Sequence, residues 1–278
     1  MTDVVNETQE CRVYEHDEWY TLIDYVTFLK HRKAYDFADE RARGLKVLDF
    51  GCGSGYGSSL LAKNAASVDG VDASAPAIAH CLEHYDMPNL TYHKIPPNTT
   101  LPFDDNSFDI VISFQVIEHM PDVQAYLQLL KRVLRPGGTL LITTPNRAHR
   151  LWPYQMNWQP AHFREYSVKT LRRELAPEFG DAELLGIYGT EEVNQIYYDH
   201  YHKSMLQAYI ILPLRIYGRK LLGNDAYDRV RNRFGLGYKL PPNPLPESEL
   251  QRFSTDDIFI ADDLVTAQDF MAVCRKPE

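Results

Sequence analysis

Four side chains that can bind a cation or move a proton stand in two short parts of the chain. Gln115, Glu118 and His119 have spacings of three and four, and His162 lies farther along. One helical turn would place the first three on a single face. Carboxylate and imidazole groups hold divalent ions such as Mg²⁺, and histidine can also act as a general base. We therefore expect all four as candidate metal ligands, with Glu118, His119 and His162 as the candidate catalytic residues.

A second group of residues lies in the segment 46–62, which contains glycines at alternate positions. Val47, Leu48 and Phe50 form a short apolar run, Gly51, Gly53 and Gly55 follow, and residues 58–62 return to a helical pattern. Glycine reaches positive φ easily and lets a ligand approach bare N–H groups, while a helix start carries partial positive charge. The segment therefore predicts a strand, a turn and a helix that bind a nucleotide-like molecule.

The spacing of these glycines excludes a dinucleotide fingerprint, which requires Gly-x-Gly-x-x-Gly. Counting from Gly51 puts Tyr56 at the third glycine, and counting from Gly53 puts Ser58 there. The strand instead carries an acid, Asp49, two residues before the first glycine. A buried acid suits a cofactor with a positive charge better than a pyrophosphate. The alternative is a tight turn that binds no ligand.

An acid also ends the next predicted strand, residues 67–72. Asp72 lies about twenty residues after the glycines, where it can accept two hydrogen bonds from a ribose diol. Its alternative role is that of a negative charge at the start of the following helix.

The elements that must position these side chains alternate between strands and helices. Further strands are predicted at 90–94, 110–114 and 139–143. Asp122 is the expected N-cap of a helix that residues 136–138 end, and Ser167 is the expected N-cap of a helix over 168–175. Consecutive βα units of this kind form a doubly wound sheet that binds its ligand along the carboxyl edge.

Taken together, these motifs resemble the class I S-adenosylmethionine-dependent methyltransferases over residues 45–190. The resemblance rests on Asp-x-Gly-x-Gly-x-Gly from Asp49, Leu-Pro-Phe at 101–103, Ile-Glu-His at 117–119, Arg-Pro-Gly-Gly at 135–138 and Thr-Pro-Asn at 144–146. Gln-Val-Ile-Glu-His at 115–119, Thr-Pro-Asn-Arg at 144–147 and His-x-Arg-Glu at 162–165 resemble bacterial sugar and polysaccharide O-methyltransferases.

The resemblance implies a Rossmann-like α/β fold with a mostly parallel sheet of seven strands, the last of them antiparallel, and a helical or irregular insertion before it. Residues 1–45 would cover the cofactor site, 46–189 with 266–278 would form the core, and 190–265 would recognise the substrate. S-adenosylmethionine is the implied cofactor and S-adenosylhomocysteine its product. The implied cofactor-binding residues are Tyr14, Asp49, Gly51, Cys52, Gly53, Gly55, Asp72, Ala73, Ser113 and Phe114.

The metal prediction has its own resemblance and its own alternative. In small-RNA 2′-O-methyltransferases a Glu-x-x-Glu-His element and a distant histidine bind the metal, and here Gln115 replaces the first glutamate. Alternatively, Glu118 and His119 only shape the loop beneath the methionine of the cofactor, as in metal-free relatives.

Composition narrows the possible partners. A chain of 278 residues with net charge −9 can form one large domain and is unsuited to broad electrostatic binding of nucleic acid. The four cysteines show no paired spacing, and no apolar run approaches the roughly 20 residues of a membrane span. We expect a cytoplasmic protein without a transmembrane segment. Residues 206–222 mix apolar and basic side chains, which could contact a membrane surface or another copy in an oligomer.

These observations predict an S-adenosylmethionine-dependent methyltransferase of class EC 2.1.1 that acts on a hydroxyl of a sugar, glycan or glycolipid. Tyrosines and histidines between 197 and 209 suit sugar rings. A quinone or phenol O-methyltransferase is favoured if the insertion forms a closed apolar pocket. A non-catalytic scaffold that binds S-adenosylmethionine is the third possibility.

Overall fold

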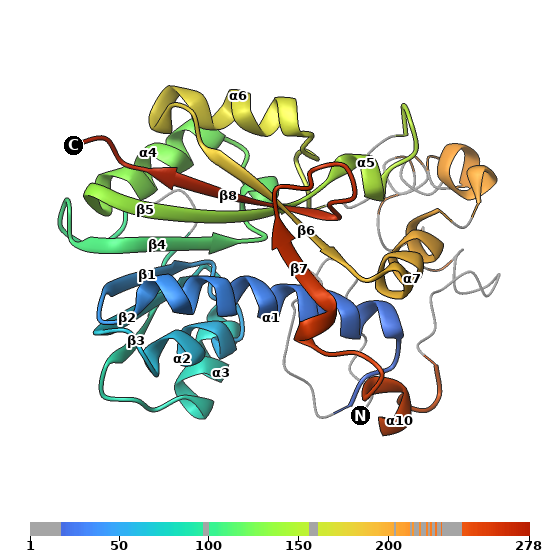
Figure 1. Ribbon diagram of the computed structural model, residues 1–278, viewed down its shortest axis with the longest axis horizontal. Coiled ribbons are helices and arrows are strands. Elements are labelled where there is room, and N and C mark those ends of the chain that lie inside the picture. Colours follow the sequence, from blue (N-terminus) through green and yellow to red (C-terminus); the bar gives the residue numbers. More distant parts are fainter. Residues whose placement is uncertain are drawn as a thin grey trace.

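The fold is built on a sheet of eight strands in the order β3-β2-β1-β4-β5-β8-β6-β7 (Figure 1). The structure, a computed structural model, describes residues 18–96, 100–155, 161–202 and 241–278, with positions 204–211, 213, 217, 221, 223, 226 and 229. The strands are β1 (Lys46–Phe50), β2 (Ser67–Asp72), β3 (Leu90–Lys94), β4 (Phe108–Phe114), β5 (Leu134–Pro145), β6 (Glu183–Gly189), β7 (Ile258–Ala261) and β8 (Asp269–Arg275). The first five are parallel, and β8 runs antiparallel between β5 and β6.

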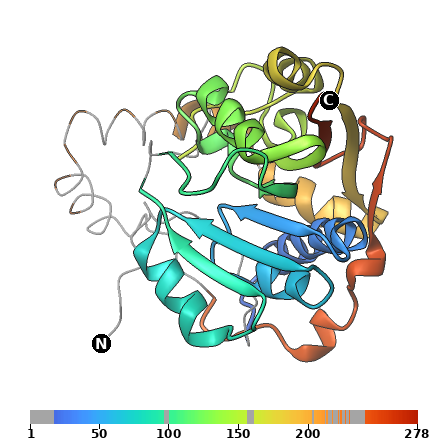
Figure 2. The same ribbon diagram turned by 90° about the vertical axis from the view of Figure 1, so that its left-hand side faces the viewer.

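Helices cover both faces of the sheet, with α4 and α6 on one face and α1 and α2 on the other (Figures 1 and 2). The helices are α1 (Leu22–Ala42), α2 (Tyr56–Ala62), α3 (Ala75–His84), α4 (Val123–Val133), α5 (Arg147–Arg150), α6 (Val168–Phe179), α7 (Glu191–Tyr201) and α10 (Glu247–Leu250). Shorter turns are η1 (Ile117–His119), η2 (Gln207–Ile211) and η3 (Thr255–Asp257). Among the described residues, no helix is both long enough and apolar enough to cross a bilayer.

The predicted doubly wound, mostly parallel sheet is confirmed, but it has eight strands rather than seven. The additional strand, β7, lies inside the segment 190–265 that we assigned to substrate recognition, and it pairs antiparallel with β6 at the sheet edge. Only four residues form it, directly after the turn η3. Such a short segment, paired with a neighbouring strand on one side only, lacks the sustained alternation of apolar and polar residues by which a strand is predicted from sequence.

The strand β5 begins earlier than the predicted 139–143. Leu134 already pairs with Phe108, while Thr139 pairs with Ile110, so residues 135–138 bulge opposite the single residue Asp109. Gly137 has a φ of 71° in this bulge. Proline and glycine are tolerated where the hydrogen-bond ladder between two strands is interrupted. The Pro-Gly-Gly sequence at 136–138 therefore indicated only the end of a helix and not the start of a strand.

Two predicted N-caps are confirmed and fix the approach to the sheet edge. Asp122 accepts a hydrogen bond from the Ala125 N–H at 3.0 Å, and Ser167 and Thr170 form a reciprocal capping box at the start of α6. The segment just before α6 also pairs with the residue after β5, because Asn146 and Tyr166 form a parallel bridge. The loop that carries His162 is therefore anchored at its far end.

Helix α1 packs on the start of α2, directly after the glycine-rich turn, through aromatic side chains that include Tyr35. A Cβ added at Gly57 would lie 2.0 Å from Tyr35 Cζ, so the Tyr35 ring rests directly on the backbone of α2. Both residues are buried. The absence of a side chain at this position lets α1 cover the turn.

We predict that Gly57→Ala destabilises the protein, although alanine is the better helix former. Overpacking against Tyr35 should lower the free energy of unfolding by about 1–3 kcal/mol, measured by urea denaturation. The double variant Gly57→Ala, Tyr35→Ala removes the clash and should show a favourable coupling between the two substitutions. A stabilised Gly57→Ala protein would contradict this packing.

Candidate active site

The glycine-rich turn after β1 has the predicted geometry. Gly51, Gly53 and Gly55 have φ values of 81°, 55° and 83°. A Cβ at Gly51 would lie 2.5 Å from Val116 Cγ2, and one at Gly55 would lie 2.7 Å from Cys81 Sγ. Side chains at these two positions are excluded both by backbone conformation and by space. The backbone of the turn is therefore bare where β1 ends and α2 begins.

Asp49 is fully buried at the end of β1. Ser58 Oγ donates to its carboxylate at 2.6 Å, and the Tyr35 hydroxyl lies 3.1 and 3.2 Å from its two oxygens. Burial raises the pKa of Asp49 to about 6, against the opposing effect of these two hydroxyl donors. A positive charge on a bound cofactor would stabilise the ionised form.

Asp72 lies at the tip of β2, facing the turn. Its Oδ2 accepts from the Gly53 N–H at 3.0 Å and its Oδ1 accepts from the Ser74 N–H at 2.7 Å. Each carboxylate oxygen retains a further lone pair, so the residue can hold the turn and still accept from ribose hydroxyls. Ala73, which follows Asp72 and precedes the N-cap Ser74 of α3, is exposed.

The other predicted cofactor contacts have different surroundings. Cys52 is buried beside the turn, and Phe114 is buried with its ring edge-on to Tyr35 at a centroid distance of 5.0 Å. Ser113 Oγ donates to the Phe50 carbonyl at 3.2 Å and accepts from Tyr126 at 2.7 Å, so its hydroxyl joins β4 to β1 and to α4. Tyr14 lies outside the described residues.

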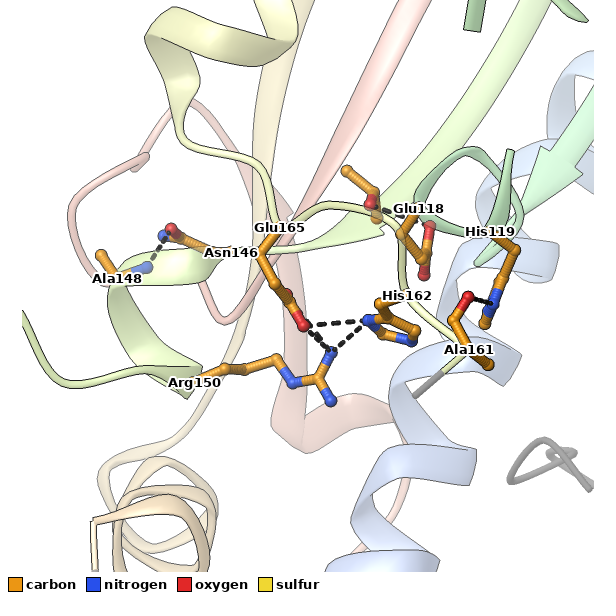
Figure 3. Close-up of polar contacts among 9 residues, drawn as sticks. Glu118, His119, Asn146, Ala148, Arg150, Ala161, His162 and Glu165 are labelled. Carbon is orange, nitrogen blue, oxygen red and sulfur yellow. Dashed lines mark hydrogen bonds and ion pairs between the residues drawn. The ribbon is translucent and has the colours of Figure 1, made fainter. Parts of the chain in front are cut away.

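Glu118, His119 and His162 converge beside the ends of β4 and β5 (Figure 3). One potential ligand atom from each of the three lies within 4.8 Å of the other two. Gln115 does not share a helical face with them, and that prediction is wrong. Its φ is 56°, and its Nε2 is directed to Thr143 Oγ1 at 3.3 Å. The left-handed conformation ends β4 before the turn η1 begins, which breaks the helical periodicity.

Glu118 is the buried acid of this cluster. Its Oε2 accepts from Thr144 Oγ1 at 2.9 Å, whereas its Oε1 is buried and makes no hydrogen bond to another described residue. Burial raises the pKa of Glu118 to about 8, opposed by its own backbone N–H and by the Thr144 hydroxyl. A buried carboxylate oxygen without a donor suits a group brought by a ligand.

Each histidine of the cluster has its Nδ1 engaged. His119 Nδ1 lies 3.0 Å from the Ala161 carbonyl, and His162 Nδ1 lies 2.9 Å from Glu165 Oε1. A carbonyl or carboxylate accepts, so both Nδ1 atoms carry the proton and both Nε2 atoms keep a lone pair. Burial lowers the pKa of His162, which favours its neutral form. This is the protonation state that both a general base and a metal ligand require.

Two buried ion pairs at this edge were not predicted from the sequence. Arg150 Nη1 lies 3.3 Å from Glu165 Oε1, and Lys30 Nζ lies 2.6 Å from Asp269 Oδ2. The partners of the second pair are 239 positions apart, so no local pattern could have revealed it. Glu165 gave a local signal, because it stands three residues after His162 in the His-x-Arg-Glu phrase.

The glycine-rich turn, Asp49 and Asp72 belong to a segment that is similar to known proteins. Residues 48–142 match the protein family described as a methyltransferase domain. This segment is similar to methyltransferase domains, and the match covers 95 of the 278 residues of the chain. The family match covers Gly51 to Gly55, Asp72, Glu118 and His119, but it stops before His162.

Two relatives illustrate the range of the similarity. A protein of Mycolicibacterium smegmatis named "Probable S-adenosylmethionine-dependent methyltransferase" is 35% identical over 162 residues, which are 58% of this chain and 62% of the relative. The ubiquinone biosynthesis O-methyltransferase of Pasteurella multocida is 37% identical over 120 residues, which are 39% of this chain and 50% of the relative. The chain thus spans less than two thirds of the length of either relative.

Solved structures show the same fold at low identity. A methyltransferase in complex with the Haloferax volcanii Trm112 methyltransferase activator superposes with a TM-score of 0.53 at 18% identity, covering 90% of this chain and 91% of that one. The [4+2]-cyclase SpnF superposes with a TM-score of 0.51 at 18% identity, covering 94% of this chain and 87% of that one. Because a cyclase shares the fold, the reaction must be argued from the site.

We predict that Asp72→Asn weakens the binding of S-adenosylhomocysteine by about 1–3 kcal/mol in titration calorimetry, since the amide accepts fewer hydrogen bonds. Asp69→Asn is the matched control, because Asp69 lies on the same strand and pairs with His93 at 2.7 Å. Equal losses in the two variants would remove Asp72 from the cofactor site.

The raised pKa of Asp49 predicts a pH dependence of cofactor binding. Below about pH 6 the carboxyl is protonated and neutral, so it attracts the ammonium group of S-adenosylhomocysteine less strongly and the affinity should fall with decreasing pH. At most one proton is linked, so the dissociation constant should rise by up to about tenfold per pH unit below 6 and level off above it. Asp49→Asn should remove this pH dependence of the dissociation constant. An unchanged pH profile in the variant would contradict the placement of Asp49 beside the cofactor.

Proposed function

We propose that the protein is an S-adenosylmethionine-dependent O-methyltransferase whose acceptor is a hydroxyl of a sugar, glycan or glycolipid. The observation that carries the proposal is the convergence of Glu118, His119 and His162 beside the methyltransferase domain's cofactor turn, with a lone pair on each imidazole Nε2. A sugar hydroxyl is a poor nucleophile at neutral pH. It needs a group that takes up its proton or makes it more acidic, and this cluster offers both.

The reaction requires one displacement and one proton transfer. When bound, S-adenosylmethionine would supply the methyl carbon that the acceptor oxygen attacks, and the carbon–sulfur bond would break with its electron pair going to the sulfonium sulfur. The acceptor proton passes to His162 Nε2, while Glu165 holds the proton on Nδ1. General-base assistance of this kind typically contributes about 10² to 10⁴ in rate. Alignment of oxygen, carbon and sulfur supplies the remainder.

The same cluster fits a divalent cation. Two imidazoles and one carboxylate form the donor set, and each is oriented from behind by Glu165, by the Ala161 carbonyl or by Thr144. Glu118, His119 and His162 would hold the ion, which would increase the acidity of a bound hydroxyl. A set with two imidazoles would bind Mn²⁺ more readily than the Mg²⁺ predicted from the sequence, because Mg²⁺ is more strictly limited to oxygen ligands.

A phenol or quinol acceptor is the second candidate, favoured by the similarity of the core to the ubiquinone biosynthesis O-methyltransferases. A phenol, with a pKa near that of tyrosine at about 10, ionises more readily than a sugar hydroxyl and depends less on a base. The buried histidine cluster favours the less acidic alcohol.

Acceptor recognition by the segment 190–265 stays a proposal, with one revision from the structure. Tyr197, expected to face the sugar, is buried, and Lys30 Nζ lies 3.8 Å from its ring centroid. Tyr198 is 51% exposed and stacks on His202 at a centroid distance of 4.5 Å, so it is the better candidate for a sugar face. Contact with a membrane surface or a second copy through 206–222 is compatible with this assignment.

We predict that chelation separates the two forms of the mechanism. If a cation acts, a chelator should abolish methyl transfer, Mn²⁺ should restore it better than Mg²⁺, and His119→Ala and Glu118→Ala should each raise the metal concentration required. If His162 acts alone as the base, the chelator should have no effect and His162→Ala should lower kcat by about 10² or more. A double variant without His119 and His162 that retained parental turnover would contradict both forms.

We also predict the acceptor class. Release of S-adenosylhomocysteine should be measured with a panel of glycosides and with catechols carrying an apolar tail, each with and without enzyme. Tyr198→Ala should raise KM for an active glycoside by up to about tenfold, since an aromatic face is worth about 0.5–1.5 kcal/mol to a stacked ring. Turnover of catechols alone would favour the phenol assignment and reject the sugar.

A further inference from the structure

We propose that Arg150 and Glu165 are positioning residues that fix the tautomer of His162 and direct its Nε2 toward Glu118 and His119. The proposal rests on the proposed function, in which His162 faces the acceptor hydroxyl. Figure 3 shows Arg150 and His162 both directed at the Glu165 carboxylate.

Burial makes this arrangement stiff. Glu165 Oε1 lies 2.9 Å from His162 Nδ1 and 3.3 Å from Arg150 Nη1. The side chains of Glu165, His162 and Arg150 are only 2%, 6% and 7% exposed, so water cannot readily replace either contact. An uncompensated charge here would be costly, which ties the two ionised groups together.

Of the two groups near His162 Nδ1, Glu165 favours a proton on this atom and Arg150 favours a lone pair there. Arg150 Nη1 also lies 3.4 Å from Nδ1, and a guanidinium can only donate, whereas a carboxylate can only accept. The Glu165 contact is the shorter of the two, and the ion pair with Arg150 holds the Glu165 carboxylate beside Nδ1. Glu165 therefore accepts from Nδ1–H, and the lone pair of His162 lies on Nε2.

The fold fixes both partners from the end of β5. Asn146 Oδ1 accepts from the Ala148 N–H at 3.0 Å, and its Nδ2 donates to the Ala267 carbonyl at 2.6 Å, which sets the direction of α5. The Arg147 N–H donates to the Tyr166 carbonyl at 2.8 Å. Helix α5, which carries Arg150, is thereby joined to the segment that carries Glu165.

Arg150 also contacts the first helix of the segment 190–265. Its Cζ lies 5.2 Å from the centroid of the Tyr201 ring on α7. Helix α7 therefore rests on the residue that orients Glu165. This contact links the proposed acceptor segment to His162 through one guanidinium group.

The test is a nuclear magnetic resonance measurement of the His162 tautomer in chelator-treated, ¹⁵N-histidine-labelled protein. Signals of His162 are identified by their loss in His162→Gln. At a pH where the ring is neutral, the wild-type protein should show the proton on Nδ1. In Glu165→Gln the ratio of Nδ1–H to Nε2–H should fall by roughly tenfold, the effect of losing one charge-assisted hydrogen bond. In Arg150→Gln the ratio should also fall, because Glu165 loses the ion pair that holds its carboxylate beside Nδ1.

Asp269→Asn is the matched control, because it breaks the other buried ion pair at this edge, with Lys30, and leaves the Glu165 contact with His162 in place. It should leave the His162 tautomer unchanged. An unchanged tautomer in Glu165→Gln, or an equal shift in Asp269→Asn, would overturn the proposal. If Arg150→Gln does not fold, Arg150→Lys should preserve the wild-type tautomer, because it retains the positive charge beside Glu165. Loss of the wild-type tautomer in Arg150→Lys would overturn the role of Arg150.

Kinetics separate this proposal from the proposed function. With an active acceptor, Glu165→Gln should lower kcat by roughly tenfold while KM for S-adenosylmethionine stays unchanged. A shifted tautomer with undiminished kcat would support the positioning pair and reject the role of His162 in methyl transfer.

Discussion

The buried carboxylate of Asp49 is the constraint on which the cofactor side of the molecule depends. It lies near the carboxyl end of β1 and is fully buried, so the chain must provide its hydrogen-bond donors. Ser58 comes from α2 and Tyr35 from α1, and the Tyr35 ring in turn requires a bare backbone at Gly57. One buried acid thus determines how two helices close over the turn. In the proposed function, the same acid would provide a negative charge for a sulfonium cofactor.

The second constraint is the direction of the strands. Parallel strands bring their carboxyl ends to one edge, so Asp49, Asp72 and the residues after β4 and β5 meet there although they lie far apart in sequence. Strand β8 runs the opposite way and therefore begins at this edge with Asp269. Its ion pair with Lys30 and the pair between Arg150 and Glu165 place two buried cations behind the site, each with its own acid. The site is thereby polar and preorganised without a net charge from these four residues.

Local sequence patterns predicted what depends on neighbouring residues. The bounds of β2 and β3, the caps Asp122 and Ser167, and the turn after Asp49 follow from short-range propensity and periodicity. The error at Gln115 arose because a helical period was extended through a residue in the left-handed region. Strand β7 was missed because four residues at a sheet edge carry little pattern.

The remaining features depend on contacts over long sequence separations. Lys30 pairs with Asp269 across the whole chain, and Tyr35 supports Asp49 from a preceding helix. Tyr197 seemed suited to a sugar by its type, but packing turned it toward Lys30. His162 was identified from its type and its surroundings in sequence, whereas its orientation by Arg150 and Glu165 follows only from the way α5 is joined to the segment before α6.

The most direct test of this account is a crystal structure with S-adenosylhomocysteine bound. The account predicts the ribose diol on Asp72 and the sulfur directed toward the Nε2 atoms of His119 and His162. Space should remain for one hydroxyl oxygen about 3–3.5 Å from the methyl position, within reach of His162 Nε2. A sulfur directed away from this cluster, or a cluster sealed from the methyl position by protein side chains, would contradict it.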